Sequence, residues 1–146
     1  MKKKAVAALS IFLVSIMLFP SCSLSNGLTN KPAIVKLFYD HKDAIISAVD
    51  GESFDEIENI RGIQSIYESD EYIDFSCGGS GFGSNTYYYG FFYSPEDSLT
   101  AWNGGACPAD ELYEYENGYK YQQTDGDNEY YVEKIGEHFF YYEAHF

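Results

Sequence analysis

Positively charged residues are scarce in this chain, which has 9 lysines and arginines against 23 aspartates and glutamates. Nucleic acids and anionic lipid headgroups bind basic surfaces, so this composition argues against direct binding to either. Two explanations of the acidity stay open. It could keep the protein soluble on a crowded cell surface, or it could attract a cationic partner, either a basic protein or divalent metal ions.

The chain also lacks an apolar run long enough to cross a bilayer. The longest run, residues 5–19, has about fifteen residues, whereas a transmembrane helix needs roughly 20. A short basic segment precedes it, and this order predicts a secretory signal peptide. Removing Lys2, Lys3 and Lys4 leaves 6 basic against 23 acidic residues, a net charge of −17 for the processed chain.

The apolar run ends in LFPSC, residues 18–22. This ending resembles a bacterial lipobox, which implies a lipoprotein that is cleaved before Cys22 and anchored by a lipid on that cysteine. The alternative is an ordinary signal peptide cleaved nearby, and in both cases the protein is exported. We therefore expect a signal peptide over 1–21, a lipidated Cys22 with a tether over 22–30, and one domain over 31–146.

Two aromatic runs, YYGFFYSPED over residues 88–97 and HFFYYEAHF over 138–146, resemble small uncharacterised lipoproteins of Gram-positive gut bacteria. That resemblance implies a location and no particular activity. We expect the protein on the extracytoplasmic face of the cell membrane, with the N-terminal lipid as its only contact with the membrane. No cofactor is expected.

Cysteine is rare, since only Cys77 and Cys107 follow Cys22. An even pair in an exported chain could form a disulfide. Such a bridge would close a loop of about thirty residues and add on the order of 3–4 kcal/mol in the chain-entropy model. The alternative is two free thiols on small buried residues.

The spacing of apolar residues predicts an α+β domain. An amphipathic helix from about Asn30 to Asp50 carries one apolar stripe: Ile34, Leu37, Phe38, His41, Ile45, Ala48 and Val49. Ser53 and Glu56 form a capping box that predicts a short second helix through about Ile60. The rest predicts an antiparallel, mostly meander β-sheet of about six strands, with the amphipathic helix packed on one face and the other face exposed.

Residues 74–94 predict the central hairpin of this sheet. A strand with Ile73, Phe75 and Cys77 facing inward leads into a glycine loop over residues 78–85, and the aromatic strand 86–93 follows. Gly90 in that strand marks a bulge or a close approach of backbone. The glycines do not form a phosphate loop, because no lysine follows them and the next element is a strand.

No motif in the chain predicts catalysis, and we name no catalytic residue. Asp125, Asp127 and Glu129 are oxygen ligands in a turn and make a weak candidate for a calcium site. The alternative is a plain turn between two strands. A hydrolase that uses paired carboxylates stays open as a third hypothesis, because the many acidic residues allow many pairs.

Aromatic residues make up 18% of the chain, more than a core of this size must bury. Exposed tyrosine and tryptophan suit either a protein partner or a sugar ring. The alternative is that these rings pack in the core and in cross-strand ladders. The leading hypothesis is a non-enzymatic, protein-binding surface lipoprotein of the inhibitor or immunity type, and the second is a module that binds cell-wall glycan. The candidate binding face comprises Tyr88, Trp102, Tyr113, Tyr121, Tyr131 and Tyr141.

Overall fold

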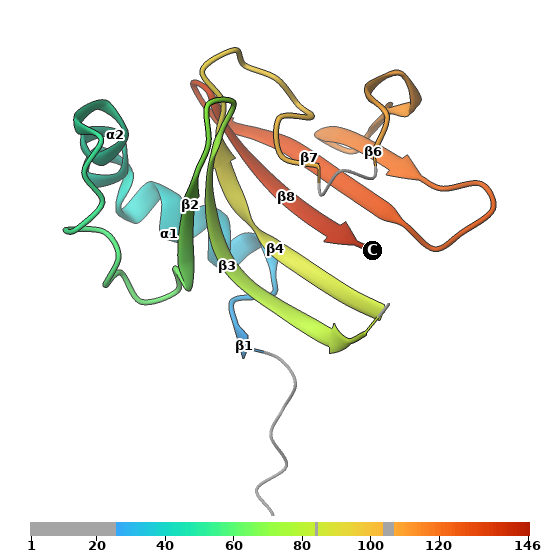
Figure 1. The fold of residues 1–146 in the computed structure, drawn as a ribbon, viewed down its shortest axis with the longest axis horizontal. Coiled ribbons are helices and arrows are strands. Elements are labelled where there is room, and N and C mark those ends of the chain that lie inside the picture. The colour runs from blue at the N-terminus through green and yellow to red at the C-terminus, as the bar shows by residue number, and fades with distance from the viewer. Residues whose placement is uncertain (1–25, 84, 104–106) are drawn as a thin grey trace, which may run out of the picture.

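The computed structural model describes residues 26–83, 85–103 and 107–146. The predicted signal peptide and Cys22 lie outside the described residues. Two helices lie near the N-terminus and the remaining elements form one antiparallel sheet (Figure 1). The elements are β1 (Asn26–Gly27), α1 (Lys31–Asp40), α2 (Lys42–Gly51), β2 (Ser65–Glu68), β3 (Ile73–Phe82), β4 (Asn85–Tyr93), the 3-10 turn η1 (Ala109–Glu111), β5 (Tyr113–Tyr115), β6 (Gly118–Gln122), β7 (Glu129–Gly136) and β8 (Phe139–His145).

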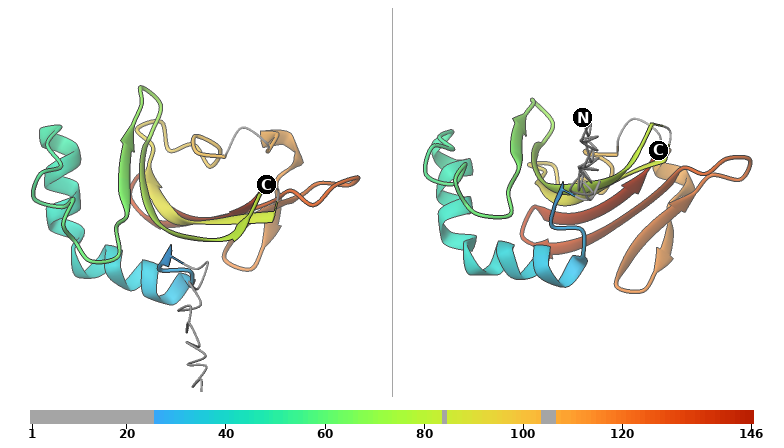
Figure 2. Two further views of the ribbon diagram at one scale, coloured as in Figure 1. Left: turned by 60° about the horizontal axis from the view of Figure 1, so that its bottom comes forward. Right: turned by 90° about the horizontal axis from the view of Figure 1, so that it is seen from below.

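The predicted long helix is two helices that meet at His41. Asn30 caps the first as expected, since its side-chain oxygen accepts the Ala33 N–H at 3.0 Å. At His41 the backbone leaves helical angles, with φ −118° and ψ 13°, so α2 turns away from α1 (Figure 2). His41 is therefore exposed and is not part of the apolar stripe. The second predicted helix, over residues 53–60, is a series of turns that still buries Ile57.

The sheet has eight strands, so the estimate of about six was low. Seven follow one path in the order β1-β3-β4-β8-β7-β6-β5, and β2 pairs with the outer side of β3. The chain leaves β4 in the middle of the sheet, crosses to the far edge and returns through β5, β6, β7 and β8. The α+β class and the antiparallel sheet are confirmed, whereas this crossing over residues 94–112 interrupts the predicted meander.

One core lies between the sheet and the helices. There Phe38 packs against Phe91 and Phe139, with ring centroids 5.6 and 5.0 Å apart. Phe75 stacks on Phe91 at 4.7 Å, so the inward direction predicted for Phe75 and its neighbours is confirmed. This helix-side core contains Ile34, Leu37, Phe38, Ile45, Ala48, Ile57, Ile63, Ile73, Phe75, Cys77, Phe91, Tyr131, Ile135, Phe139 and Tyr141.

A second core lies on the opposite face of the sheet. The sequence predicts that this face is exposed, and that prediction is wrong. The described residues of the crossing segment, 94–103 and 107–112, lie over that face, on the side away from α1 (Figure 2). The Tyr130 hydroxyl donates to the carbonyls of Leu99 and Trp102 at 3.0 and 2.5 Å, and Trp102 stacks on Tyr142 at 3.7 Å. This loop-side core contains Phe92, Cys107, Tyr121, Tyr130, Val132, Phe140, Tyr142 and Ala144.

The glycine run is part of a strand, not a loop. β3 continues through Phe82, and Gly78 and Gly79 pair with Gly27 and Asn26 of β1. A Cβ on Gly27 would lie 2.2 Å from the Cys77 carbonyl oxygen, so only glycine lets β1 approach this closely. Residues 26 and 27, predicted to belong to a free tether, are therefore the first strand of the domain.

Candidate functional site: a tyrosine-lined groove

The helices leave part of their side of the sheet uncovered, toward the start of β4 and the end of β8. In an antiparallel sheet directly paired residues point to the same face. Two cross-strand rows therefore share this uncovered area: Tyr113, Lys120, Tyr131, Glu143 and Tyr89 in one, and Gln122, Glu129, His145 and Tyr87 in the other.

These rows line a groove with a volume of about 280 Å³, which we name the tyrosine groove. It is bounded by the first residue of α1 on one side and by the turn between β5 and β6 on the other. Its residues are Lys31, Tyr87, Tyr115, Glu116, Lys120, Glu129, Tyr130, Tyr131, Glu143, Ala144 and His145. Rings and charges thus alternate along its walls.

Two ring faces in the groove are covered by the chain's own lysines. The Lys31 ammonium lies 5.0 Å from the Tyr131 ring centroid, and Lys120 lies 5.5 Å from that of Tyr115. Both distances fit cation–π contacts. Tyr87 stacks on the buried ring of His145 at 4.2 Å, so one of its faces is also occupied. The groove therefore presents ring edges, hydroxyls and carboxylates more than open ring faces.

The lysines of the groove are paired, which leaves its carboxylates in excess. Lys31 forms an ion pair with Glu133, and Lys120 lies 3.3 Å from Glu129. Burial alone would lower the pKa of Lys31, but its hydrogen bonds to Glu133 and Tyr131 raise it overall. Glu143 accepts the Tyr141 hydroxyl at 2.5 Å, and Glu116 is exposed.

The predicted binding residues do not form one face. Tyr131 and Tyr141 are buried on the helix side, and register places Tyr113 on the same side, where it is exposed. Tyr121 is buried and Trp102 half-buried in the loop-side core. Tyr88 is exposed, but it shares that loop side with Phe92. The prediction of a single face is therefore wrong, and Tyr131 is the only one of the six that lines the groove.

Sequence reasoning missed most of the groove, which depends on Lys31, Tyr87, Tyr115, Glu143 and His145. The alternation of side chains along β4 and β8 indicates which of these residues share a face. It does not indicate which strands are neighbours, and the chain order had suggested a meander. The groove forms because β8 lies between β4 and β7.

The two cysteines do not form the disulfide that the sequence allowed. Both are free and buried, Cys77 in the helix-side core and Cys107 in the loop-side core, so the sheet separates them. Burial raises the pKa of Cys77 to about 12 and that of Cys107 to about 11, with smaller contributions from the charges of Asp74 and Glu111 respectively.

The weak calcium candidate is not assembled. Asp125 and Asp127 are exposed in a turn that the Gln123 N–H closes by donating to the Asn128 carbonyl at 2.9 Å. Glu129 instead approaches Lys120 in the groove. Within residues 26–83, 85–103 and 107–146, no group of three metal-ligating side chains comes together.

A buried carboxyl, Asp74, lies in the loop-side half of the sheet and is 9% exposed. It accepts the Tyr142 hydroxyl at 3.0 Å. Burial raises the pKa of Asp74 to about 7, while hydrogen bonds from Tyr142 and Trp102 act in the opposite direction. A Cβ on Gly90 would lie 2.7 Å from the Tyr142 hydroxyl oxygen, so the close approach predicted at Gly90 is what gives this hydroxyl room.

Comparison of the chain with protein-family models, with curated proteins and with solved structures finds no match. In the described part of the chain, none of the helices has the length and apolar character needed to span a bilayer. The residues of the groove are therefore the main guide to what the protein binds.

Proposed function

We propose that this protein is an exported, lipid-anchored surface protein that binds a partner protein through the tyrosine groove, as an inhibitor or an immunity-type protector. The observation that carries the proposal is the composition of the groove, with tyrosines 38–44% exposed at positions 87 and 115 beside the carboxylates of Glu116 and Glu143. Tyrosine is a favoured residue where proteins bind each other, because it combines a large apolar body with a polar tip.

Protein is favoured over glycan because sugar rings stack on open aromatic faces. Lysine ammonium groups cover Tyr115 and Tyr131, and the chain's only tryptophan, Trp102, is stacked on Tyr142 inside the loop-side core. Of the predicted binding residues, Tyr88 and Tyr113 remain exposed, and the Tyr88 ring lies 6.4 Å from that of Phe146. A module that binds cell-wall glycan is thus the second candidate, with Tyr88 as its platform.

The partner that suits the groove is basic. Its lysines are already paired, and the processed chain carries a net charge of −17 from 6 basic and 23 acidic residues. Complementary charge raises association rates and selects partners more than it adds affinity. A hydrolase is the third candidate, because Asp74 has a raised pKa, but Asp74 contacts residues of the core and is not among the residues that line the groove.

The test is affinity capture from a surface-protein extract with the processed chain, residues 23–146, as bait. We expect the wild-type chain to retain a specific protein and the double variant Tyr87→Ala/Tyr115→Ala to lose it. Tyr67→Ala is the matched control, since Tyr67 is 58% exposed and is not among the residues of the groove. Retention on purified cell wall without any captured protein, lost in Tyr88→Ala, would replace this proposal with the glycan candidate.

A further inference from the structure

The first strand fixes where the lipid anchor meets the domain. β1 pairs antiparallel with β3, with Asn26 opposite Gly79 and Gly27 opposite Gly78. Asn26 therefore lies closer than Gly27 to the turn between β3 and β4, and the N-terminal end of β1 faces that turn. Cys22 precedes Asn26 by four residues, which span at most about 14 Å.

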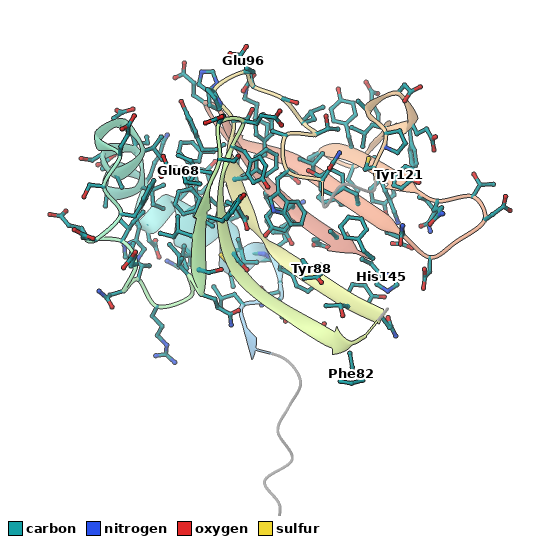
Figure 3. All side chains as sticks on the ribbon, viewed as in Figure 1. Glu68, Phe82, Tyr88, Glu96, Tyr121 and His145 are labelled. Atoms are coloured by element: carbon teal, nitrogen blue, oxygen red, sulfur yellow. The ribbon has the colours of Figure 1, made fainter. Side chains whose placement is uncertain are left out.

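The tip of the β3–β4 hairpin reaches a comparable distance in that direction. Phe82 lies three residues beyond Gly79, about 10 Å along the strand. Figure 3 shows Phe82 at the extreme end of this hairpin, with Tyr88 and His145 farther back. Phe82 is 84% exposed, the most exposed large apolar side chain of the described residues. An anchor at Cys22, at most about 14 Å from Asn26, therefore has this phenylalanine within its reach.

The hairpin also has the composition of a segment that contacts lipid. No charged residue occurs from Phe75 to Pro95, although the chain has 23 acidic residues. Tyr87 and Tyr88 are exposed on opposite sides of β4, paired with Ser80 and Gly79. Tyrosines therefore flank the hairpin about two residues behind an apolar tip. Tyrosine is enriched at the headgroup level of membranes, and a phenylalanine beyond it would reach the acyl chains.

We propose that the β3–β4 hairpin tip is a second membrane contact, in which Phe82 inserts into the lipid bilayer while Tyr87 and Tyr88 lie among the headgroups. The inference rests on the lipid anchor in the proposed function, because the anchor supplies the proximity. It does not depend on which partner the tyrosine groove binds, although Tyr87 lines the groove as well as the hairpin. It replaces the expectation that lipid on Cys22 is the protein's sole contact with the membrane.

The test uses the processed chain with an N-terminal hexahistidine tag in place of the lipid, held on phosphatidylcholine vesicles that contain a nickel-chelating lipid. Phe82→Trp places a fluorophore at the tip, and acyl chains carrying bromine quench a tryptophan that enters the bilayer. On vesicles without bromine, we expect the emission of the introduced tryptophan to shift to the blue. On vesicles with brominated acyl chains, we expect most of this emission to be quenched. Trp102 contributes the same background to every variant, which the wild-type chain measures.

The matched control is Tyr67→Trp, because Tyr67 is 58% exposed on β2, which pairs with the opposite end of β3. We expect no quenching there. Equal quenching, or none, in the two variants would overturn the proposal. The proposal would also be overturned if Phe82→Ala lost partner capture while Phe82→Trp showed no quenching. That result would assign the hairpin tip to a protein interface. Because the tag replaces the lipid, this result does not depend on whether Cys22 is lipidated.

Discussion

Asp74 is a charged group held where a carboxylate is costly, and its hydrogen bonds explain why it is tolerated. It accepts the Tyr142 hydroxyl, and Tyr142 in turn stacks on Trp102 of the crossing segment. A carboxyl buried in this way favours its neutral form, which accounts for a pKa raised to about 7. Asp74 and Trp102 thus contact the same residue, Tyr142.

Replacing Asp74 with Asn should change how stability depends on pH. The folded pKa lies above the unfolded one, so between about pH 4 and pH 7 the folded state binds a proton that the unfolded state has released. The contribution of Asp74 to the free energy of unfolding is therefore highest at low pH and falls as pH rises to about 7. We compare the free energy of unfolding of Asp74→Asn with that of wild type by urea denaturation. The difference should move in favour of Asp74→Asn by on the order of 2–4 kcal/mol from pH 4 to pH 8.

Asp70→Asn is the control for that measurement, because Asp70 is exposed in the turn before β3 and its removal changes the net charge equally. It should leave the pH dependence almost unchanged. If the curves of wild type and Asp74→Asn run parallel from pH 4 to pH 8, the raised pKa of Asp74 is wrong.

The two cysteines should behave as protected thiols. Burial raises the pKa of Cys77 to about 12 and that of Cys107 to about 11, so at pH 8 both are neutral and poorly reactive. Mass spectrometry should find neither alkylated in the folded chain and both alkylated after unfolding without reductant. Two unmodified cysteines after such unfolding would instead show a disulfide.

Individual side-chain directions were predicted well where one face is apolar, as at Ile73 and Phe75. They were not predicted for the tyrosines. A tyrosine fits a core and a surface equally well, so its presence at positions 121, 131 and 141 does not indicate exposure. The sheet buries aromatic residues on both faces because the crossing segment covers the second one, and that segment has no periodicity by which to recognise it.

At the scale of elements, local sequence signals in the C-terminal half agree with the strands β5 to β8. Turn residues such as Asn117-Gly118 bound them, and period-two patterns fill them. The order of the strands was not predictable from such local signals, because it depends on the crossing to β5. The break at His41 also lacks a local signal, since the apolar spacing continues through it.

The sequence predicts a loop for the glycines of β3 and a tether for Gly27 of β1. Here they allow β1 to lie against β3, and Gly27→Ala should separate the two. Its φ of +81° disfavours other residues, and its Cβ would lie 2.2 Å from the Cys77 carbonyl oxygen. We expect a loss of about 1–2 kcal/mol in the free energy of unfolding. The Leu28 amide, which donates to that carbonyl at 2.9 Å, should exchange its hydrogen faster.

Gly51→Ala is the matched control, because no atom lies within 4 Å of its Cβ position and it ends α2. It should be neutral or slightly stabilising. Unchanged exchange at Leu28 in the Gly27→Ala variant would show that β1 does not need a glycine there.

At the scale of the whole molecule, the proposed anchor predicts where the protein fractionates. In cells, wild type should stay with the membrane through a carbonate wash, and Cys22→Ala should be released. The hairpin tip alone cannot hold the chain, because burying one phenylalanine contributes only about 1.5–3 kcal/mol. A Cys22→Ala variant that withstands the same wash would refute the anchor. As a control, detergent-solubilised samples of wild type and Cys22→Ala show that both proteins fold and accumulate.

For a chain anchored at Cys22 as proposed, the pairing of β1 with β3 also limits how far the groove can move from the bilayer. With β1 bound to the sheet, the span from Cys22 to the domain is four residues, at most about 14 Å, and not the nine of a free tether. A linker this short would keep the tyrosine groove close to the bilayer surface. A partner held in the same membrane then meets it by diffusion in two dimensions, at the high effective concentration that a short linker gives. Lengthening this linker would lower the effective concentration of the groove at its partner and would leave every contact in the groove unchanged.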